Sequence, residues 1–373
     1  MDQTINETFL YRLALSLGHK IGPGVYKNII SYSGSAEGFF KLPAGKAAKI
    51  PGIGEKLLSI RKQKDQLLRD AEKLALDCQK KGIHIFSYLD PGYPERLKPI
   101  EDAPVILYSK GNVDFNAFRT IGIVGTRNAT EYGKAITQKI VEDLLPYQPL
   151  VISGLAYGID IEAHRSSLKH HMSTIGVLGS PLDKIYPAAH KSTSESMMEN
   201  GGIVSEFRLG AEMVPGNFPQ RNRIIAGLSD ALIVVEAAKR GGALITAEIA
   251  YSYNKEVLAV PGNLQSIYSE GCNNLIRSMK AAIYTGPKDL EDSLSWSKDT
   301  INAQQPPQKV RDYSTLDEEE AKIMALMEGN EELDIDRISW QTQIPIYLLA
   351  SKLLNLEFQG FVKSLPGKRY KVS

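Results

Sequence analysis

Several short segments in the middle of the chain combine glycine, hydroxyl and arginine side chains in a way that suits phosphate binding. Gly125, Thr126 and Arg127 directly follow the run Thr-Ile-Gly-Ile-Val. Backbone N–H groups at a helix start and a guanidinium that donates two parallel hydrogen bonds together match a phosphate group. The second and third glycines of the dinucleotide-binding Gly-x-Gly-x-x-Gly motif are missing, which argues against a nicotinamide or flavin cofactor.

An arginine pair that follows Phe-Pro-Gln is the sharpest of these features. We expect Arg221, Asn222 and Arg223 to lie at the start of an apolar helix. Cations are unfavourable at that end of the helix macrodipole unless an anion binds there, so a bound phosphate would resolve the conflict. The alternative is an internal ion pair with Glu206 or Glu236, and we expect at least one of the two arginines to be used in this way.

Two further glycine segments each precede an expected helix. Ser153 and Gly154 follow the run Leu-Val-Ile, and Gly242 and Thr246 belong to the segment Gly-Gly-Ala-Leu-Ile-Thr-Ala-Glu. The free N–H groups of a helix start make both segments candidates for anion binding.

The other polar side chains of this region favour structural roles. We expect Asp160 to cap a helix rather than to act as a catalytic acid, and His164, which has no partner at ligand spacing, to be a core residue. The two cysteines, Cys78 and Cys272, are far apart and near no histidine cluster, so neither a disulfide nor a metal site is expected. No nucleophile with a positioned base is evident, which favours binding without catalysis.

The elements that must position these residues follow from the hydrophobic pattern. Between residues 120 and 286, six short β-branched runs alternate with amphipathic helical stretches. This alternation predicts an α/β fold, a Rossmann-like, doubly wound parallel sheet. The loops at the carboxyl ends of its strands face one crevice, and all the glycine segments above lie in such loops or open the helices that follow them.

The segments before and after the sheet domain have sequence patterns that differ from its alternating strands and helices. Two glycine turns, Gly22-Pro23-Gly24 and Gly52-Ile53-Gly54, interrupt an N-terminal helical pattern and resemble a tandem helix-hairpin-helix, which either contacts DNA phosphate or only packs a small module. Near the C-terminus, helical patterns at 316–327, 335–342 and 345–358 precede a hairpin at Pro366-Gly367, the order of a winged helix. The predicted domains are a helical domain, a Rossmann-like domain with a strand-rich lead-in, a linker and a winged helix, at residues 1–80, 81–295 (lead-in 81–118), 296–313 and 314–373.

Composition limits the functional classes. The chain has 44 Lys+Arg and 43 Asp+Glu residues, a formal net charge of +1, which excludes a cationic wrap around nucleic acid over the whole surface. The sequence begins without a secretory signal pattern and has no run of about 18 apolar residues, so we expect a cytoplasmic protein without a membrane partner.

The ordered blocks GTR, SGLAYGID, LGSPLDKIYP, GGIVSEF, FPQRNRIIAGLSD, VVEA, GGALITAEIA, VPGN and GCNNLI resemble the DNA-processing protein A (DprA/Smf) family. The resemblance implies a single-stranded DNA-binding recombination mediator that protects incoming DNA and loads the RecA recombinase during natural transformation. It also implies a homodimer formed through the sheet domain, no covalent chemistry and no cofactor. Position by position, it implies phosphate contacts at Arg127, Gly154, Arg221 and Arg223, and a further one at Lys184.

The sequence differs from the family pattern at two positions, and two other functions are alternatives to the one that the family implies. Lys239-Arg240 precedes the glycines where the family shows Ser-Gly-Ser, and Met279-Lys280 stands where the family favours glycine. The main rival is a Rossmann-type enzyme of nucleotide metabolism similar to nucleoside-monophosphate phosphoribohydrolases, with Glu248 as its acid. Against it, Leu244 occupies a position where that motif has glycine.

The other rival is a transcription regulator that reads DNA through the winged helix. A DNA-reading winged helix should be basic on its third helix, yet that segment has only Lys352 against Glu357. Basic side chains gather instead in the expected wing, at Lys363, Lys368, Arg369 and Lys371. We therefore expect the winged helix to serve in protein interaction or regulation.

Overall fold

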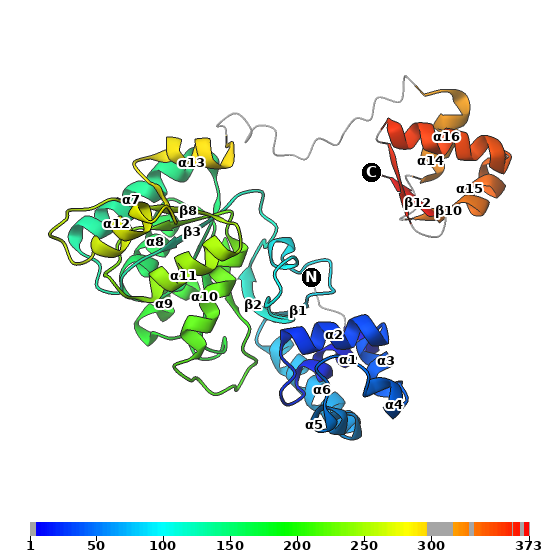
Figure 1. Cartoon of the computed structure of the whole chain (residues 1–373), viewed down its shortest axis with the longest axis horizontal. Helices are drawn as coiled ribbons and strands as arrows, with labels where there is room; N and C mark the ends of the chain where they lie inside the picture. The colour runs from blue at the N-terminus through cyan, green and yellow to red at the C-terminus, as the bar shows by residue number, and fades with distance from the viewer. Residues whose placement is uncertain (1–4, 297–315, 328–331, 360, 366–368, 373) are drawn as a thin grey trace. The chain divides into compact units, whose positions relative to one another are not determined.

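The computed structural model describes residues 5–296, 316–327, 332–359, 361–365 and 369–372. The chain divides into two compact units, Met1–Ile301 and Asn302–Ser373, which are described separately (Figure 1). Apart from Trp296, the predicted linker at residues 296–313 lies outside the described residues.

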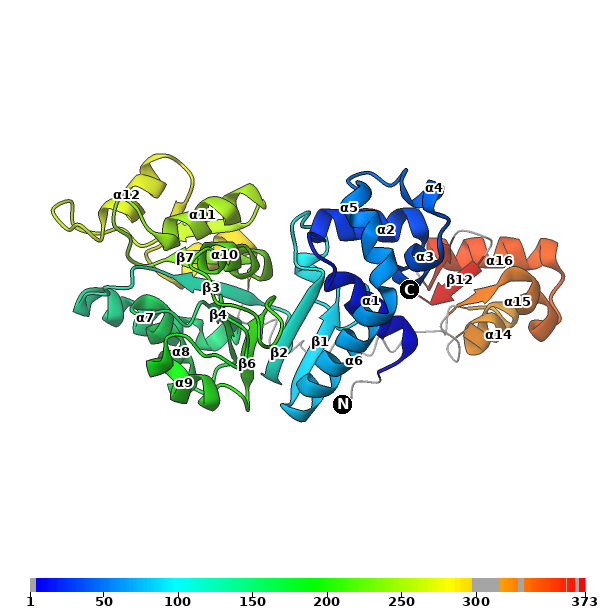
Figure 2. The same ribbon diagram turned by 90° about the horizontal axis from the view of Figure 1, so that it is seen from below.

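Six helices form the N-terminal part of the first unit. Asn6 caps the first helix by accepting a hydrogen bond from the Phe9 amide (2.8 Å), and Gly34 ends the second with φ +76°, a left-handed conformation that suits glycine. The longest helix, α6, lies beside the first strand (Figures 1 and 2). The helices are α1 (Glu7–Ser16), α2 (Pro23–Ser33), α3 (Ala36–Lys41), α4 (Ala44–Ala47), α5 (Glu55–Leu58) and α6 (Lys64–Lys80).

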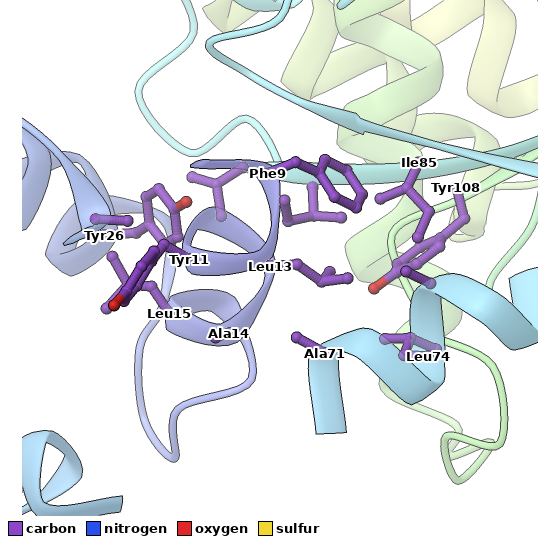
Figure 3. Close-up of a cluster of buried hydrophobic side chains, with 14 of the residues drawn as sticks. Phe9, Tyr11, Leu13, Ala14, Leu15, Tyr26, Ala71, Leu74, Ile85 and Tyr108 are labelled. Carbon is purple, nitrogen blue, oxygen red and sulfur yellow. The ribbon is translucent and has the colours of Figure 1, made fainter. Parts of the chain in front are cut away.

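A single hydrophobic core joins this helical part to the sheet. Figure 3 shows Phe9 and Leu13 of α1 extending toward the sheet residues Ile85 and Tyr108, with Leu74 of α6 beside Tyr108. All five side chains are buried. The helical part is therefore fixed against the sheet by apolar contact.

The main sheet has nine strands in the order β1-β2-β6-β5-β4-β3-β7-β8-β9. Strands β3 to β9 run parallel to one another, whereas β1 and β2 add an antiparallel edge that joins the sheet at β6. The strand-rich lead-in is thus part of the same sheet. The strands are β1 (Ile83–Ser87), β2 (Ile106–Asn112), β3 (Thr120–Val124), β4 (Leu150–Ser153), β5 (Thr174–Val177), β6 (Gly201–Ser205), β7 (Ala231–Val234), β8 (Glu256–Ala259) and β9 (Ala282–Ile283).

Helices cover both faces of the sheet, which explains why its central strands are buried throughout. In Figure 2, α10 and α11 lie on one face and α7, α8 and α9 on the other. The predicted Rossmann-like architecture is confirmed. The helices are α7 (Glu131–Leu144), α8 (Ile159–Lys169), α9 (Lys191–Ser196), α10 (Asn217–Leu228), α11 (Gly242–Ser252), α12 (Glu270–Arg277) and α13 (Pro287–Leu294).

The strand order reverses at β3. From β3 the chain proceeds outward through β4, β5 and β6, and then returns to place β7 on the other side of β3. Loops that leave adjacent strands in opposite directions open a crevice at the carboxyl ends of β3 and β7. This topology positions the candidate site.

The second unit is a small winged helix with its own core, in which Ile338, Leu349 and Leu353 are fully buried. Its three-stranded sheet has the order β10-β12-β11, and the predicted turn at Pro366-Gly367 lies outside the described residues. The elements are α14 (Glu318–Met327), β10 (Leu333–Asp334), α15 (Ile335–Thr342), α16 (Ile346–Phe358), β11 (Val362–Leu365) and β12 (Arg369–Val372). Within the described parts of both units, no helix has the length and apolar character to cross a bilayer.

Candidate nucleic-acid interface

A cavity of about 230 Å³ lies at the switch point of the sheet. Residues from the end of β3, from the loops after β3, β4 and β7, and from α8, α10 and α11 line this crevice. Seven of the eleven predicted site residues meet in it, namely Gly125, Thr126, Arg127, Arg221, Asn222, Gly242 and Thr246. Segments more than 100 residues apart in sequence therefore form one site.

Arg127 is an exposed cation at the mouth of this crevice. Its guanidinium makes no hydrogen bond or ion pair with any residue that the structure describes. The loop that holds it is fixed on both sides, because the Thr126 amide donates to Glu236 O (2.7 Å) and the Thr126 carbonyl accepts from the Ile159 amide (3.2 Å). Arg127 is thus presented to solvent from a rigid backbone.

The start of α11 supplies backbone donors to the same crevice. Ile245 is the first residue of this helix whose amide finds an intrahelical acceptor, Gly241 O at 3.3 Å, so the amides before it are free to bind a ligand. Asn222 Nδ2 and the Thr246 hydroxyl both donate to Gly242 O, at 3.3 and 3.0 Å. The two side chains hold the helix start in place, and its N–H groups face an anion-sized space.

Arg221 lies beneath the crevice with only 5% of its surface exposed. Its Nη1 donates to Gly154 O at 2.6 Å and to Val177 O. Asp160 lies on the other side of Gly154, where a Cβ would be 2.5 Å from Asp160 Oδ2 and 2.6 Å from Arg221 Nη2. Only glycine fits between these two charged groups. The hydrogen bond from Arg221 to Gly154 O connects the loop after β4 to α10.

Burial dominates the ionisation of these groups. Loss of solvation raises the pKa of Asp160 and lowers that of Arg221 to about 10, while the charge of each group partly opposes the shift of the other. His164 is fully buried, its Nδ1 is 2.7 Å from Thr174 Oγ1, and burial lowers its pKa to about 3. It is therefore neutral at pH 7, in keeping with a core histidine.

The prediction that Asp160 caps helix α8 is wrong. Gly158 occupies the cap position, and Asp160, two residues further on, accepts a hydrogen bond from the Gly154 amide at 3.1 Å. The carboxylate therefore closes the loop after β4 rather than capping the helix. A short acidic side chain before an apolar helix fits both roles, so sequence could not separate them.

The position of the arginine pair in α10 also differs from the expectation. The helix begins at Asn217, so Arg221 and Arg223 lie in its second turn rather than at its start. The macrodipole acts mainly within the first turn, so it does not explain these arginines. Pro219 lies in the first turn of α10, where a proline is tolerated.

Arg223 pairs with an acid, as expected for at least one of the arginines. Its Nη2 is 2.6 Å from Glu206 Oε2, and the side chain is only 8% exposed. It lines a separate groove of about 1210 Å³, together with Asp102 and with Pro23 and Gly24 at the start of α2. Arg223 thus lies on the opposite side of α10 from the crevice.

Three more predicted residues lie outside the crevice lining. Ser153 is buried and donates to Ile123 O (2.6 Å), and Gly154 is enclosed between Asp160 and Arg221. Lys184 is exposed in the loop after β5.

The first glycine turn of the helical domain opens α2 toward the larger groove. Gly22 and Gly24 have no heavy atom within 4 Å of a Cβ position, and the helix hydrogen bonds begin with the Tyr26 amide, which donates to Gly22 O at 2.9 Å. In the same helix, Lys27 Nζ donates to Ile100 O and Glu101 O, both at 2.8 Å. This lysine attaches the helical part to the lead-in, so both interpretations of the turn stay open.

Two residues outside the predicted site set lie at or beside the crevice; for Arg240 the sequence had left open a backbone contact or a solvated side chain. Arg240 is exposed and lines the crevice beside the start of α11, and Tyr157 follows Ala156, another lining residue. For Arg240, the sequence feature that indicated a site residue was the basic pair Lys239-Arg240 directly before the glycines. For Tyr157, the feature that indicated a site residue was an aromatic side chain in a glycine-containing loop.

Glu248, the acid of the enzyme alternative, does not line the crevice. Its carboxylate oxygens each lie 2.8 Å from Lys280 Nζ on the surface. Glu236, whose backbone carbonyl accepts from the Thr126 amide, is buried, and its carboxylate accepts from the Thr130 amide and hydroxyl at 2.9 and 2.6 Å. Both acids are therefore engaged in structural contacts.

Comparisons with known proteins identify the class to which this fold and site belong. Residues 84–295 match the family model of DNA recombination-mediator protein A, and residues 305–368 match that of the DprA winged helix domain. The chain therefore belongs to the DprA/Smf family of DNA-processing recombination mediators, which confirms the resemblance drawn from the sequence.

Individual relatives agree with this assignment. Protein Smf of Synechocystis sp. is 32% identical over 400 residues, covering 98% of this chain and 99% of its own. DNA processing protein DprA of Streptococcus pneumoniae is 39% identical over 207 residues, or 56% of this chain and 73% of its own.

Solved structures show the same fold. The X-ray structure of DprA from Streptococcus pneumoniae has a TM-score of 0.66 at 31% identity, covering 78% of this chain and 98% of that one. A DprA structure from Helicobacter pylori, described for its single-stranded DNA binding mode, has a TM-score of 0.52 at 27% identity, covering 57% and 95% of the two chains.

Proposed function

We propose that this chain binds single-stranded DNA in the crevice at the carboxyl ends of β3, β4 and β7. The observation that carries the proposal is the meeting of an exposed guanidinium, Arg127, with the open N-terminus of α11 at the switch point. Both features bind phosphate without reading sequence, so little base preference is expected. The single-stranded DNA binding of the Helicobacter pylori relative supports the same ligand.

We further propose that the bound strand is passed to a RecA-type recombinase during natural transformation, and that the chain acts as a homodimer through its sheet domain. Membership of the recombination-mediator family supports the first part. Exposed apolar side chains that flank α12, Leu264 and Met279, support a protein contact on the sheet domain. A monomeric mass at micromolar concentration would contradict the dimer.

Binding without covalent catalysis fits the described side chains. Asp160 and Glu236 are held by backbone amides, and the Thr126 hydroxyl accepts from the Asn128 amide (3.2 Å). Release of free base from nucleoside monophosphates, abolished by Glu248→Gln, would instead establish the enzyme alternative.

The winged helix fits a role in protein interaction. Lys352, the one cation of α16, is paired with Asp317, and Tyr347 and Phe358 of the same helix are 81% and 82% exposed. Exposed aromatic rings on a helix without free cations suit a protein partner better than a DNA groove.

Equilibrium binding to a labelled single strand and to its duplex tests the proposed function. We expect clear preference for the single strand, because the free bases and flexible backbone of a single strand can enter the crevice. Equal binding of both forms, or binding of neither, would contradict the proposal. Strong preference for one duplex sequence would favour a transcription regulator.

A further inference from the structure

One exposed aromatic side chain lies in a loop that borders the crevice, next to the lining residue Ala156, and has no part in phosphate binding. Tyr157 lies in the loop between β4 and α8 and is 48% exposed. Its ring packs on His190 with centroids 4.8 Å apart and planes at 69°, an edge-to-face contact. Whichever ring supplies the edge, at least one face of the tyrosine is left uncovered by this contact.

The support beneath Tyr157 is rigid. His190 is buried, and its Nδ1 lies 2.7 Å from Leu155 O, in the same loop as Tyr157. The Ile161 amide closes the loop by donating to Ala156 O at 3.1 Å. A ring held in this way loses little conformational entropy when a ligand packs on it.

The loop also places Tyr157 beside Arg127. Its neighbour Gly158 has φ +78°, and a Cβ there would lie 2.1 Å from Thr126 O and 2.7 Å from Arg127 O. Its other neighbour, Ala156, lines the crevice. Tyr157 therefore stands between a crevice-lining residue and the backbone of the exposed arginine.

We propose that Tyr157 stacks on a nucleobase of the strand whose phosphate is bound at Arg127 and the start of α11. This inference rests on the proposed function and adds a base contact to its phosphate contacts. Base–aromatic stacking tolerates any sequence because every base has a π-face. It also favours single strands, because the bases of a duplex are already stacked on one another.

The test measures binding of the full chain to an oligothymidylate strand and to an abasic strand of the same length. Stacking of one base on an aromatic ring predicts a loss of affinity of about five- to tenfold for the thymidylate strand in Tyr157→Ala. The abasic strand should bind both proteins alike, and the salt dependence should be unchanged because no charge is removed. Tyr157→Phe should bind like wild type.

Tyr32→Ala is the matched control, since Tyr32 is a 59% exposed tyrosine at the end of α2, a position that the proposal does not use. Wild-type affinity of Tyr157→Ala for the thymidylate strand would overturn the inference. So would an equal loss for both strands, since that points to a displaced loop. If Arg127→Ala weakens binding while Tyr157→Ala does not, only the stacking role fails; absence of strand binding by wild type overturns the proposed function as well.

Discussion

Arg221 and Arg127 belong to the same crevice, yet the structure predicts opposite consequences for their removal. Arg221→Met deletes a buried guanidinium that donates to Gly154 O and Val177 O and leaves Asp160 buried without its countercharge. Leaving a buried charge without a compensating charge costs about 3–5 kcal/mol. Arg127 is exposed and unpaired among the described residues, so Arg127→Ala should change stability by less than about 0.5 kcal/mol.

Thermal and urea unfolding of the full chain measure this difference. In a unit that spans Met1–Ile301, a loss of 3–5 kcal/mol lowers Tm by about 5–8 °C, whereas Arg127→Ala should have the Tm of wild type. Adding Asp160→Asn to Arg221→Met should recover part of the loss, because the buried carboxylate charge is removed while an amide oxygen still accepts from Gly154. A fully stable Arg221→Met that loses only strand affinity would refute the structural role assigned to Arg221.

Two other changes probe the groups that fix the crevice. Burial lowers the pKa of His164 to about 3 in the folded chain, whereas its ordinary pKa is 6.5. Between pH 6.5 and pH 3 the unfolded chain therefore binds one more proton than the folded chain. The free energy of unfolding should fall by about 1.4 kcal/mol for each pH unit as the pH decreases through this range. Urea titrations at pH 7 and pH 5 should show this slope, and an identical slope in His164→Gln would contradict it. Gly158→Ala should destabilise by about 1–3 kcal/mol and weaken strand binding, because a Cβ would meet Thr126 O in a left-handed backbone; a fully stable variant with wild-type affinity would show that the loop is not fixed in this way.

Sequence patterns could predict the architecture because each pattern is local. The β-branched runs, with helical stretches between them, determine a parallel sheet, and β3 begins and ends as its run predicts, at Thr120 and Val124. The winged helix follows for the same reason, with α15 covering residues 335–342. The antiparallel joining of β1 and β2 to the sheet depends on contacts between distant segments, which no local pattern encodes.

The candidate site was predictable only in part. Glycine and arginine positions located the crevice, because strand ends in a parallel sheet meet at one edge. The partners of the buried arginine were not predictable, since Arg221 bonds the carbonyl of Gly154, 67 residues earlier in the chain. The two arginines of α10 face different cavities, and that division depends on where the helix begins.

The salt dependence of single-strand binding by wild type and Arg127→Ala tests the central claim most directly. Each phosphate neutralised on a single strand contributes about −0.7 to the slope of log affinity against log salt concentration. We expect a steep slope for wild type, a slope shallower by about 0.7 for Arg127→Ala, and matching thermal stability of the two proteins. Equal slopes and equal affinities would show that the strand does not contact Arg127 and would contradict phosphate binding in the crevice.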